Sequence, residues 1–222
     1  MICHSFARYR KGEVKREIVL LKGNGRMKSK IGVLLRAVCI SGLFLLFLMF
    51  PMAVQAQCLC TTNSDNTMTI VEYDGSHGAV ILPGAINGMP VTSIGLNAFF
   101  YHTNLTSVTI PTSLTIIGDC AFNYCTGLTN IMIGNSVTVI GFQAFGYCPL
   151  TSVTIPDSVT TIGGSAFGTC ANLTSVYFKG NAPKLGDANV FHDCKNATIY
   201  YLPGTKGWEA TFGGRPTKLW KQ

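Results

Sequence analysis

The sequence predicts a mostly-β solenoid, in which short coils of chain stack on one another and share a core. The first observation is a threefold repeat: residues 105–127, 128–149 and 150–172 read LTSVTIPTSLTIIGDCAFNYCTG, LTNIMIGNSVTVIGFQAFGYCP and LTSVTIPDSVTTIGGSAFGTCAN. The periods of 23, 22 and 23 residues are typical of solenoids. The second observation is that apolar residues fall at the same positions in every copy, and one coil cannot bury them alone.

Each copy is expected to begin with a strand and to contain a second bend. In the segment 108–110, apolar and polar side chains alternate, which is typical of a strand with one buried face. Pro111 and Pro156 would end that strand, because proline cannot donate to a ladder, and Gly134 takes this place in the middle copy. An Ile-Gly pair in every copy indicates a tighter bend, where glycine permits an unusual dihedral or a close approach.

The repeat resembles the BspA-like leucine-rich repeat of bacterial surface proteins, whose pattern is close to L-x-x-V-x-I-P-x-S-V-x-x-I-G-x-x-A-F-x-x-C. About ten positions match in each of the three copies. The resemblance implies a right-handed leucine-rich-repeat solenoid with a parallel sheet on one face. It also implies a secreted or surface-attached protein that adheres to something, but it supplies no ligand.

The first 56 residues have the composition of a leader. A basic segment precedes an uncharged stretch over residues 37–54, and the small residues of a cleavage site end at Ala56. We expect a signal peptide over residues 27–56, cleaved after Ala56, with residues 1–26 as an over-extended start. The alternative is an uncleaved N-terminal membrane anchor, because 18 uncharged residues are long for a signal.

The net charge of +7 belongs to this leader. Residues 1–56 hold 10 Lys+Arg and 2 Asp+Glu, whereas the remaining 166 residues hold 7 and 8, a net charge of −1. A nucleic-acid-binding protein needs a basic face on its folded part. We therefore expect no nucleic acid as partner, and contact with a membrane only through an uncleaved leader.

The chain after the leader divides into a repeat region and two caps. Residues 57–79 are expected to form an N-terminal cap, residues 80–196 the leucine-rich repeats, and residues 197–222 a C-terminal cap. The first coil is longer than the others, with about five extra residues around Asn87-Gly88, a turn signal. The bulky C-terminal residues expected to cover the last coil are Trp208, Phe212 and Trp220.

Seven cysteines follow the leader, and four of them recur at one repeat position: Cys125, Cys148, Cys170 and Cys194. The first coil has His102 there. One interpretation is a metal site or stacked disulfides, but zinc needs ligands that converge tetrahedrally, and a ladder places them in a line. The favoured interpretation is a row of buried thiols acting as small apolar side chains. Cys58, with Cys60 or another cap residue, is the better disulfide candidate in an oxidising compartment.

The motifs that carry chemistry are missing, so we expect no enzyme and no cofactor. The sequence contains no G-x-S-x-G, no H-E-x-x-H and no glycine-rich phosphate loop. No two carboxylates recur at matched repeat positions, as a glycosidase would need. Ser165, in GGSAF, weakly resembles a serine-hydrolase motif, but the repeat explains its position.

The expected binding face consists of the strand residues that point away from the core. They are Ser107, Thr109, Asn130, Met132, Ser152, Thr154, Ser175 and Tyr177. Because solenoids commonly bind through such a surface, we expect a secreted or cell-surface protein that binds an extracellular protein or glycan without catalysis. One alternative is that threonine and serine are simply good exposed strand residues. Another is a structural spacer or self-assembling module without a specific ligand.

Overall fold

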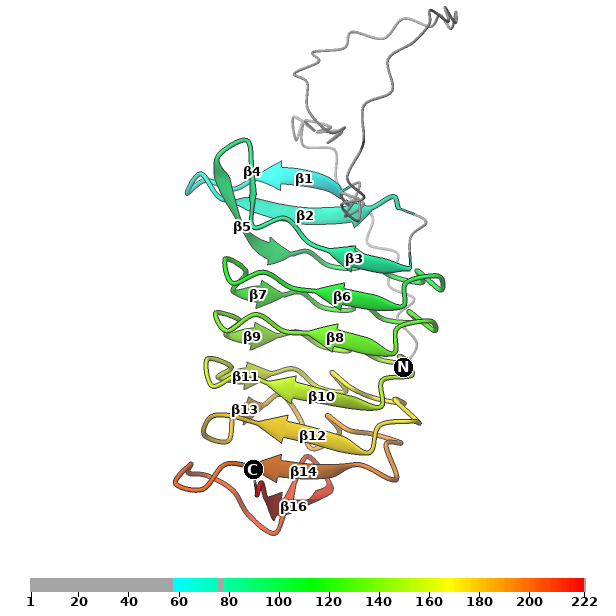
Figure 1. Cartoon of the computed structure of the whole chain (residues 1–222), viewed down its shortest axis with the longest axis vertical. Coiled ribbons are helices and arrows are strands. Elements are labelled where there is room, and N and C mark those ends of the chain that lie inside the picture. The colour runs from blue at the N-terminus through cyan, green and yellow to red at the C-terminus, as the bar shows by residue number, and fades with distance from the viewer. Residues whose placement is uncertain (1–57, 76–77, 222) are drawn as a thin grey trace, which may run out of the picture.

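The computed structural model describes residues 58–75 and 78–221, so the expected leader and its cleavage site lie outside the described residues. The described chain forms sixteen strands and no helix. Its coils stack into an elongated solenoid in which equivalent strands lie side by side (Figure 1). Among these residues, none forms a helix long and apolar enough to span a bilayer. The predicted mostly-β solenoid is confirmed.

The first face of the solenoid is built from the strands that open each repeat. They are β3 (Ala79–Ile81), β6 (Ser107–Thr109), β8 (Asn130–Met132), β10 (Ser152–Ile155), β12 (Ser175–Phe178), β14 (Thr198–Tyr201) and β16 (Arg215–Leu219). Paired neighbours among them run parallel and in register. At the C-terminal end, β15 (Thr211–Phe212) pairs antiparallel with β16.

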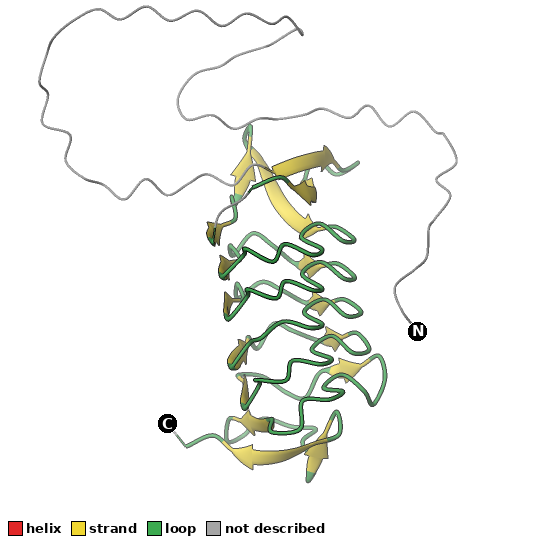
Figure 2. Ribbon diagram, turned by 90° about the vertical axis from the view of Figure 1, so that its right-hand side faces the viewer, coloured by secondary structure: helices red, strands yellow, loops and turns green. Residues whose placement is uncertain are grey.

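A second sheet, which the sequence analysis did not predict, forms from the Ile-Gly segments. Its parallel strands are β2 (Met68–Tyr73), β5 (Met89–Ile94), β7 (Ile116–Ile117), β9 (Val139–Ile140), β11 (Thr161–Ile162) and β13 (Lys184–Leu185). Outside it, β1 (Cys58–Thr62) pairs antiparallel with β2. The predicted bend is therefore the end of a very short strand, and strands occupy two sides of the stack (Figure 2).

The long first coil contains a hairpin. Here β4 (Ala85–Ile86) pairs antiparallel with the start of β5. Asn87 and Gly88 between them have φ angles of 52° and 79°. Two successive positive φ angles are what a two-residue hairpin turn requires. The turn predicted from Asn-Gly is confirmed.

Close approach between coils explains the glycine that follows each short strand. A Cβ on Gly118 would lie 2.6 Å from the carbonyl oxygen of Ile94, and one on Gly163 would lie 2.4 Å from the backbone nitrogen of Phe142. Neither glycine has a positive φ. Of the two reasons for glycine that the sequence left open, close packing is the one that applies.

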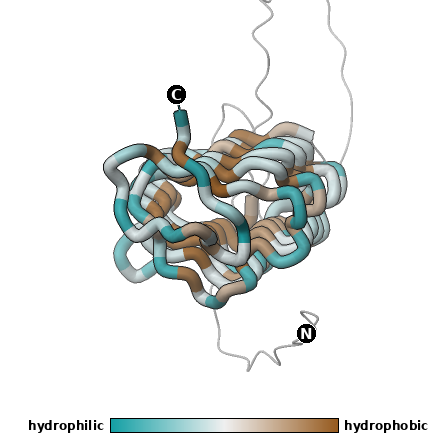
Figure 3. Tube along the Cα trace, turned by 90° about the horizontal axis from the view of Figure 1, so that it is seen from below, coloured by the Kyte–Doolittle hydropathy of each residue, from teal (hydrophilic) through white to brown (hydrophobic). Residues whose placement is uncertain are grey.

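A ladder of aromatic rings runs through the core. Stacked neighbours lie 4.7–5.6 Å apart between ring centroids, and the ladder consists of Tyr73, Phe99, Phe122, Phe145, Phe167 and Phe191. All six side chains are buried. Viewed along the solenoid axis, successive coils lie over one another around this common interior (Figure 3). The repeat register read from the sequence therefore matches the packing.

The turn that carries each Ala-Phe pair contains two residues with left-handed backbone. The first group has φ angles of 49–59° and consists of Asn97, Cys120, Gln143 and Ser165. The second group has φ angles of 57–63° and consists of Tyr101, Tyr124, Tyr147, Thr169 and Asp193. The turns also bond from coil to coil, since the Phe122 N–H donates to the Ala144 carbonyl at 2.7 Å. Ser165 is thus a turn residue, which accounts for its place in the repeat.

The first sheet is interrupted in the middle, between β8 and β10. Strands β3, β6 and β8 form one sheet, and β10, β12, β14, β16 and β15 form another. The chain that leads into β10 is one residue shorter than in the first repeat, because Pro149 alone stands where Thr126-Gly127 does. Strands β8 and β10 still lie next to each other. Over the described residues, however, no backbone ladder joins them.

Candidate binding groove

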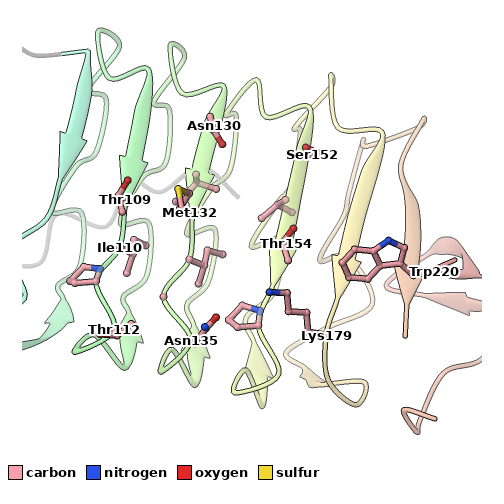
Figure 4. Close-up of a pocket in the computed structure, with 16 residues that line it drawn as sticks. Thr109, Ile110, Thr112, Asn130, Met132, Asn135, Ser152, Thr154, Lys179 and Trp220 are labelled. Carbon is pink, nitrogen blue, oxygen red and sulfur yellow. The ribbon is translucent and has the colours of Figure 1, made fainter. Parts of the chain in front are cut away.

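A groove of about 790 Å³ lies on the first face, across β6, β8 and β10 and over the interruption (Figure 4). Five residues of the predicted binding face line it: Thr109, Asn130, Met132, Ser152 and Thr154. Of the other three, Ser107 lies on β6, and Ser175 and Tyr177 lie on β12, the strand that pairs with β10. Met132, at the centre, exposes 62% of its surface.

Strand register arranges the eight predicted residues in two rows. In one row Thr109 pairs with Met132, and Thr154 with Tyr177. In the other, Ser107 pairs with Asn130, and Ser152 with Ser175. Alternation along the strand places the buried Val108, Ile131, Val153 and Val176 between the rows, facing the core. The structure therefore brings the predicted residues together on one surface.

The side chains of the predicted binding face differ in their hydrogen bonding from threonines that only stabilise the sheet. One residue earlier in the repeat, Thr129 Oγ1 donates to the Thr106 carbonyl at 3.4 Å, and Thr174 Oγ1 to the Thr151 carbonyl at 3.1 Å. By contrast, the side chains of Thr109, Asn130 and Thr154 bond to no other group of the described chain. Threonines that stabilise the stack by bonding from coil to coil therefore lie one residue before the binding face, as Thr129 and Thr174 do. The side chains of the binding face keep free hydrogen-bond donors and acceptors.

Two residues outside the prediction complete the groove, Lys179 and Trp220 (Figure 4). The sequence predicts that Trp220, like Trp208, covers the last coil. Trp208 does so, with its ring 4.9 Å from that of Phe178. The Trp220 ring instead lies 4.9 Å from that of Tyr177 on the first face. No repeat signal marks Trp220, because its position depends on β16 joining the sheet after β14.

A second exposed surface was also missed, and we call it the tyrosine strip: Tyr101, Tyr124 and Tyr147. These residues share one repeat position, in the turns that follow the second sheet. The rings of Tyr124 and Tyr147 stack 4.1 Å apart, and Tyr101 exposes 64% of its surface. In the sequence, the recurring pattern A-F-x-Y marks these three positions.

The four cysteines of the repeat are free and buried, and each thiol has a specific role. They donate to the carbonyl oxygen of the core phenylalanine one coil back, as in Cys125 Sγ to Phe99 at 2.9 Å and Cys148 Sγ to Phe122 at 3.1 Å. In the first coil, His102 stands at the cysteine position, and its Nε2 lies 2.8 Å from the Tyr73 carbonyl oxygen, the equivalent acceptor. A buried carbonyl needs such a partner. These thiols are therefore more than the apolar fillers that the sequence suggested.

Cys58 and Cys60 are also free, contrary to the disulfide predicted for them. The two side chains lie on the same buried side of β1. Residues two apart on a strand are separated by about 6.6 Å, whereas a disulfide needs Cβ atoms about 3.5–4.5 Å apart. Burial raises the pKa of Cys58 to about 12 and that of Cys60 to about 11. Within the described residues, no group of three His, Cys, Asp or Glu side chains is placed to hold a metal ion.

Comparison with known proteins identifies the class. A sequence model of the BspA-type leucine-rich repeat region matches residues 92–208 in six copies, and the chain belongs to this family. Similar solved structures include a leucine-rich repeat protein of T. pallidum, with 27% identity, a TM-score of 0.50, and coverage of 66% of this chain and 84% of that one. A second, from Bacteroides capillosus, has 33% identity and a TM-score of 0.50, covering 55% of this chain and 93% of that one.

A third structure, the pneumococcal vaccine antigen PcpA, is similar in fold. It has 20% identity and a TM-score of 0.51, with coverage of 75% of this chain and 47% of that one. No curated protein sequence matches the chain. The particular protein is thus a leucine-rich-repeat protein of the bacterial surface-protein type.

Proposed function

We propose that this protein is a non-catalytic binding protein, which captures an extracellular protein or glycan in the groove on its first face. The observation that carries the proposal is the groove itself, where free hydroxyl and amide groups surround the exposed Met132. A binding site typically combines an apolar surface with a few polar groups that fix the ligand's orientation. The groove offers this combination across β6, β8 and β10.

The proposed location is the cell surface or the extracellular space. A basic segment followed by an uncharged stretch and small residues is the pattern of an export signal. The BspA-like repeat, with which the chain shares its pattern, is found in bacterial surface proteins. An N-terminally anchored form is the alternative. Detection of a new N-terminus at Gln57 in the exported protein would distinguish cleavage from anchoring.

The proposal is tested by presenting the full-length protein to arrays of extracellular proteins and glycans. A specific ligand is expected, and the double variant Met132→Ala/Tyr177→Ala should weaken its binding at least tenfold, because both side chains project from the binding face. Tyr101→Ser is the matched control, since it removes an exposed aromatic ring from the tyrosine strip and leaves the groove intact. Equal losses in both variants, or none, would argue against the groove.

A second candidate function, end-to-end self-assembly, is favoured by the distribution of charge along the solenoid. Residues 57–178 contain five acidic residues and no Lys or Arg, whereas residues 179–222 contain seven Lys or Arg and three acidic residues. One end of the stack is therefore negative and the other positive, and opposite charges attract at low ionic strength. Such head-to-tail contacts between copies would build an open filament.

Sedimentation velocity at low and high salt tests the second candidate. Assembly predicts larger species at low salt, which dissociate as salt rises, and a change in size when Trp208→Ala disturbs the C-terminal end. A monomer at every salt concentration would reject it. Ligand capture in the groove would then stand alone.

A further inference from the structure

We propose that the ligand of the groove is an acidic glycan, a chain of sugar rings that carry carboxylate groups. This inference rests on the proposed function and adds the chemical class of the ligand. Three features of the first face carry it: its positive charge, its aromatic rings, and its free hydroxyl and amide groups.

The charge at the groove is positive and unbalanced. Lys179 is the only charged side chain among the described residues that line the groove. On the same face, Lys218 of β16 continues the row of Tyr177 and Tyr200, because it pairs with Tyr200 in register. Both lysines are exposed, and over residues 58–75 and 78–221 neither forms an ion pair. Their ammonium groups are available to an anion.

Asp157, an acidic residue in the adjacent coil, does not cancel this charge. Asp157 follows Pro156 in the turn after β10, and its backbone lies against Gly180, where an added Cβ would be 2.7 Å from the Asp157 Cα. Its side chain is exposed and is not paired with Lys179 within the part of the chain that the structure describes. A ligand carboxylate that approaches Lys179 from the groove therefore meets a lysine without a bound partner.

Aromatic rings flank the lysines. Tyr177 and Tyr200 stack with their centroids 5.1 Å apart and an interplanar angle of 21°, and Trp220 lies 4.9 Å from Tyr177 at 44°. Large rings with a polar tip offer an apolar surface and a hydrogen-bonding group together. The C–H face of a pyranose ring packs on such a surface, while its hydroxyl groups reach Asn130, Ser152 and Thr154 in the groove.

The sheet geometry favours a glycan over an acidic peptide. Peptides commonly bind to sheets by pairing their main chain with an exposed edge. The groove instead lies on the face of the sheet, where the ladders between β6 and β8 and between β10 and β12 use main-chain groups. Within the described chain no ladder joins β8 and β10, but these two strands lie next to each other and leave no room for a peptide strand between them. Recognition must come from side chains, and hydroxyl and amide side chains match the many hydroxyl groups of a sugar.

The test compares oligogalacturonate with its carboxyl-reduced, neutral counterpart, using the full-length protein and calorimetric titration. The acidic oligomer is expected to bind at least tenfold more tightly than the neutral one, and its affinity should fall as salt rises. Lys179→Gln should lower the affinity for the acidic oligomer about tenfold. Lys184→Gln is the matched control, because Lys184 is exposed on β13 of the second sheet.

The outcomes separate this inference from the proposed function. Equal affinity for the two oligomers, equal effects of Lys179→Gln and Lys184→Gln, or equal binding of poly-glutamate would overturn the acidic-glycan assignment. The same holds when neither oligomer binds but the arrays return another ligand that the Met132→Ala/Tyr177→Ala variant loses; the proposed function then stands. When no ligand of any class binds, both fail.

Discussion

Replacing Phe145 with alanine is expected to lower the free energy of unfolding by roughly 3–5 kcal/mol. The ring is fully buried in the central coil and stacks on Phe122 and Phe167, with centroids 5.3 Å from each. Its loss leaves a cavity that both neighbouring coils line. In a repeat array, stability depends on the contacts between adjacent coils, so the defect should reach both. Urea unfolding followed by circular dichroism measures the change.

Phe142→Ala is the matched control for this prediction. The same residue type stands three positions earlier, but its side chain is 41% exposed. A surface substitution of this kind usually changes stability by no more than about 0.5 kcal/mol. An unchanged midpoint for Phe145→Ala, or a similar loss for Phe142→Ala, would contradict the register on which the core is built.

Gly163→Ala is expected to lower the free energy of unfolding by about 3 kcal/mol, the upper end of the range for overpacked sites. The new Cβ would lie 2.4 Å from the Phe142 nitrogen and 2.6 Å from the Gly141 carbonyl carbon. Both are backbone atoms, which cannot move aside as a flexible side chain can. The coils would have to separate, and thermal unfolding should show an earlier midpoint.

Gly84→Ala provides the control, since its Cβ would meet Ser113 Oγ at 3.5 Å and Pro111 Cβ at 3.7 Å, ordinary contact distances. Gly84 has no positive φ, so alanine fits its backbone. This variant should be neutral or stabilised by up to about 1 kcal/mol, because alanine restricts the unfolded chain. A neutral result for Gly163→Ala would show that the second sheet is more loosely stacked than described.

The repeat made much of this fold predictable. Alternation of apolar and polar residues in the V-x-I segment predicted the strands of the first sheet. It also predicted which side chains point outward on the binding face, since strand periodicity decides which side chains share a face. The recurrence of apolar residues at fixed positions predicted one shared core, and the stacked phenylalanines lie within it. The Asn87-Gly88 turn followed from the backbone preferences of those two residues. Each of these features depends on local pattern, and local pattern is what a sequence displays directly.

The features that were missed depend on contacts between coils. The second sheet consists of strands as short as two residues, β7 for example, and so short a strand has no alternation to read. The interruption of the first sheet coincides with one missing residue before Leu150, and it appears only when the coils are stacked. Trp220 lies outside the repeat and reaches the groove through the pairing of β16 with β14. The second sheet, the interruption and the place of Trp220 all depend on how the coils stack, which no single repeat shows.

The claim that the groove is the binding site is tested most directly by methyl NMR of protein labelled at methionine. Met132 lies in the groove, whereas Met68 is buried in β2 of the second sheet and serves as an internal reference. Titration with the ligand that the arrays return should shift the Met132 methyl signal and leave that of Met68 in place. A saturable ligand that moves Met68 but not Met132, or moves neither, would contradict binding in the groove.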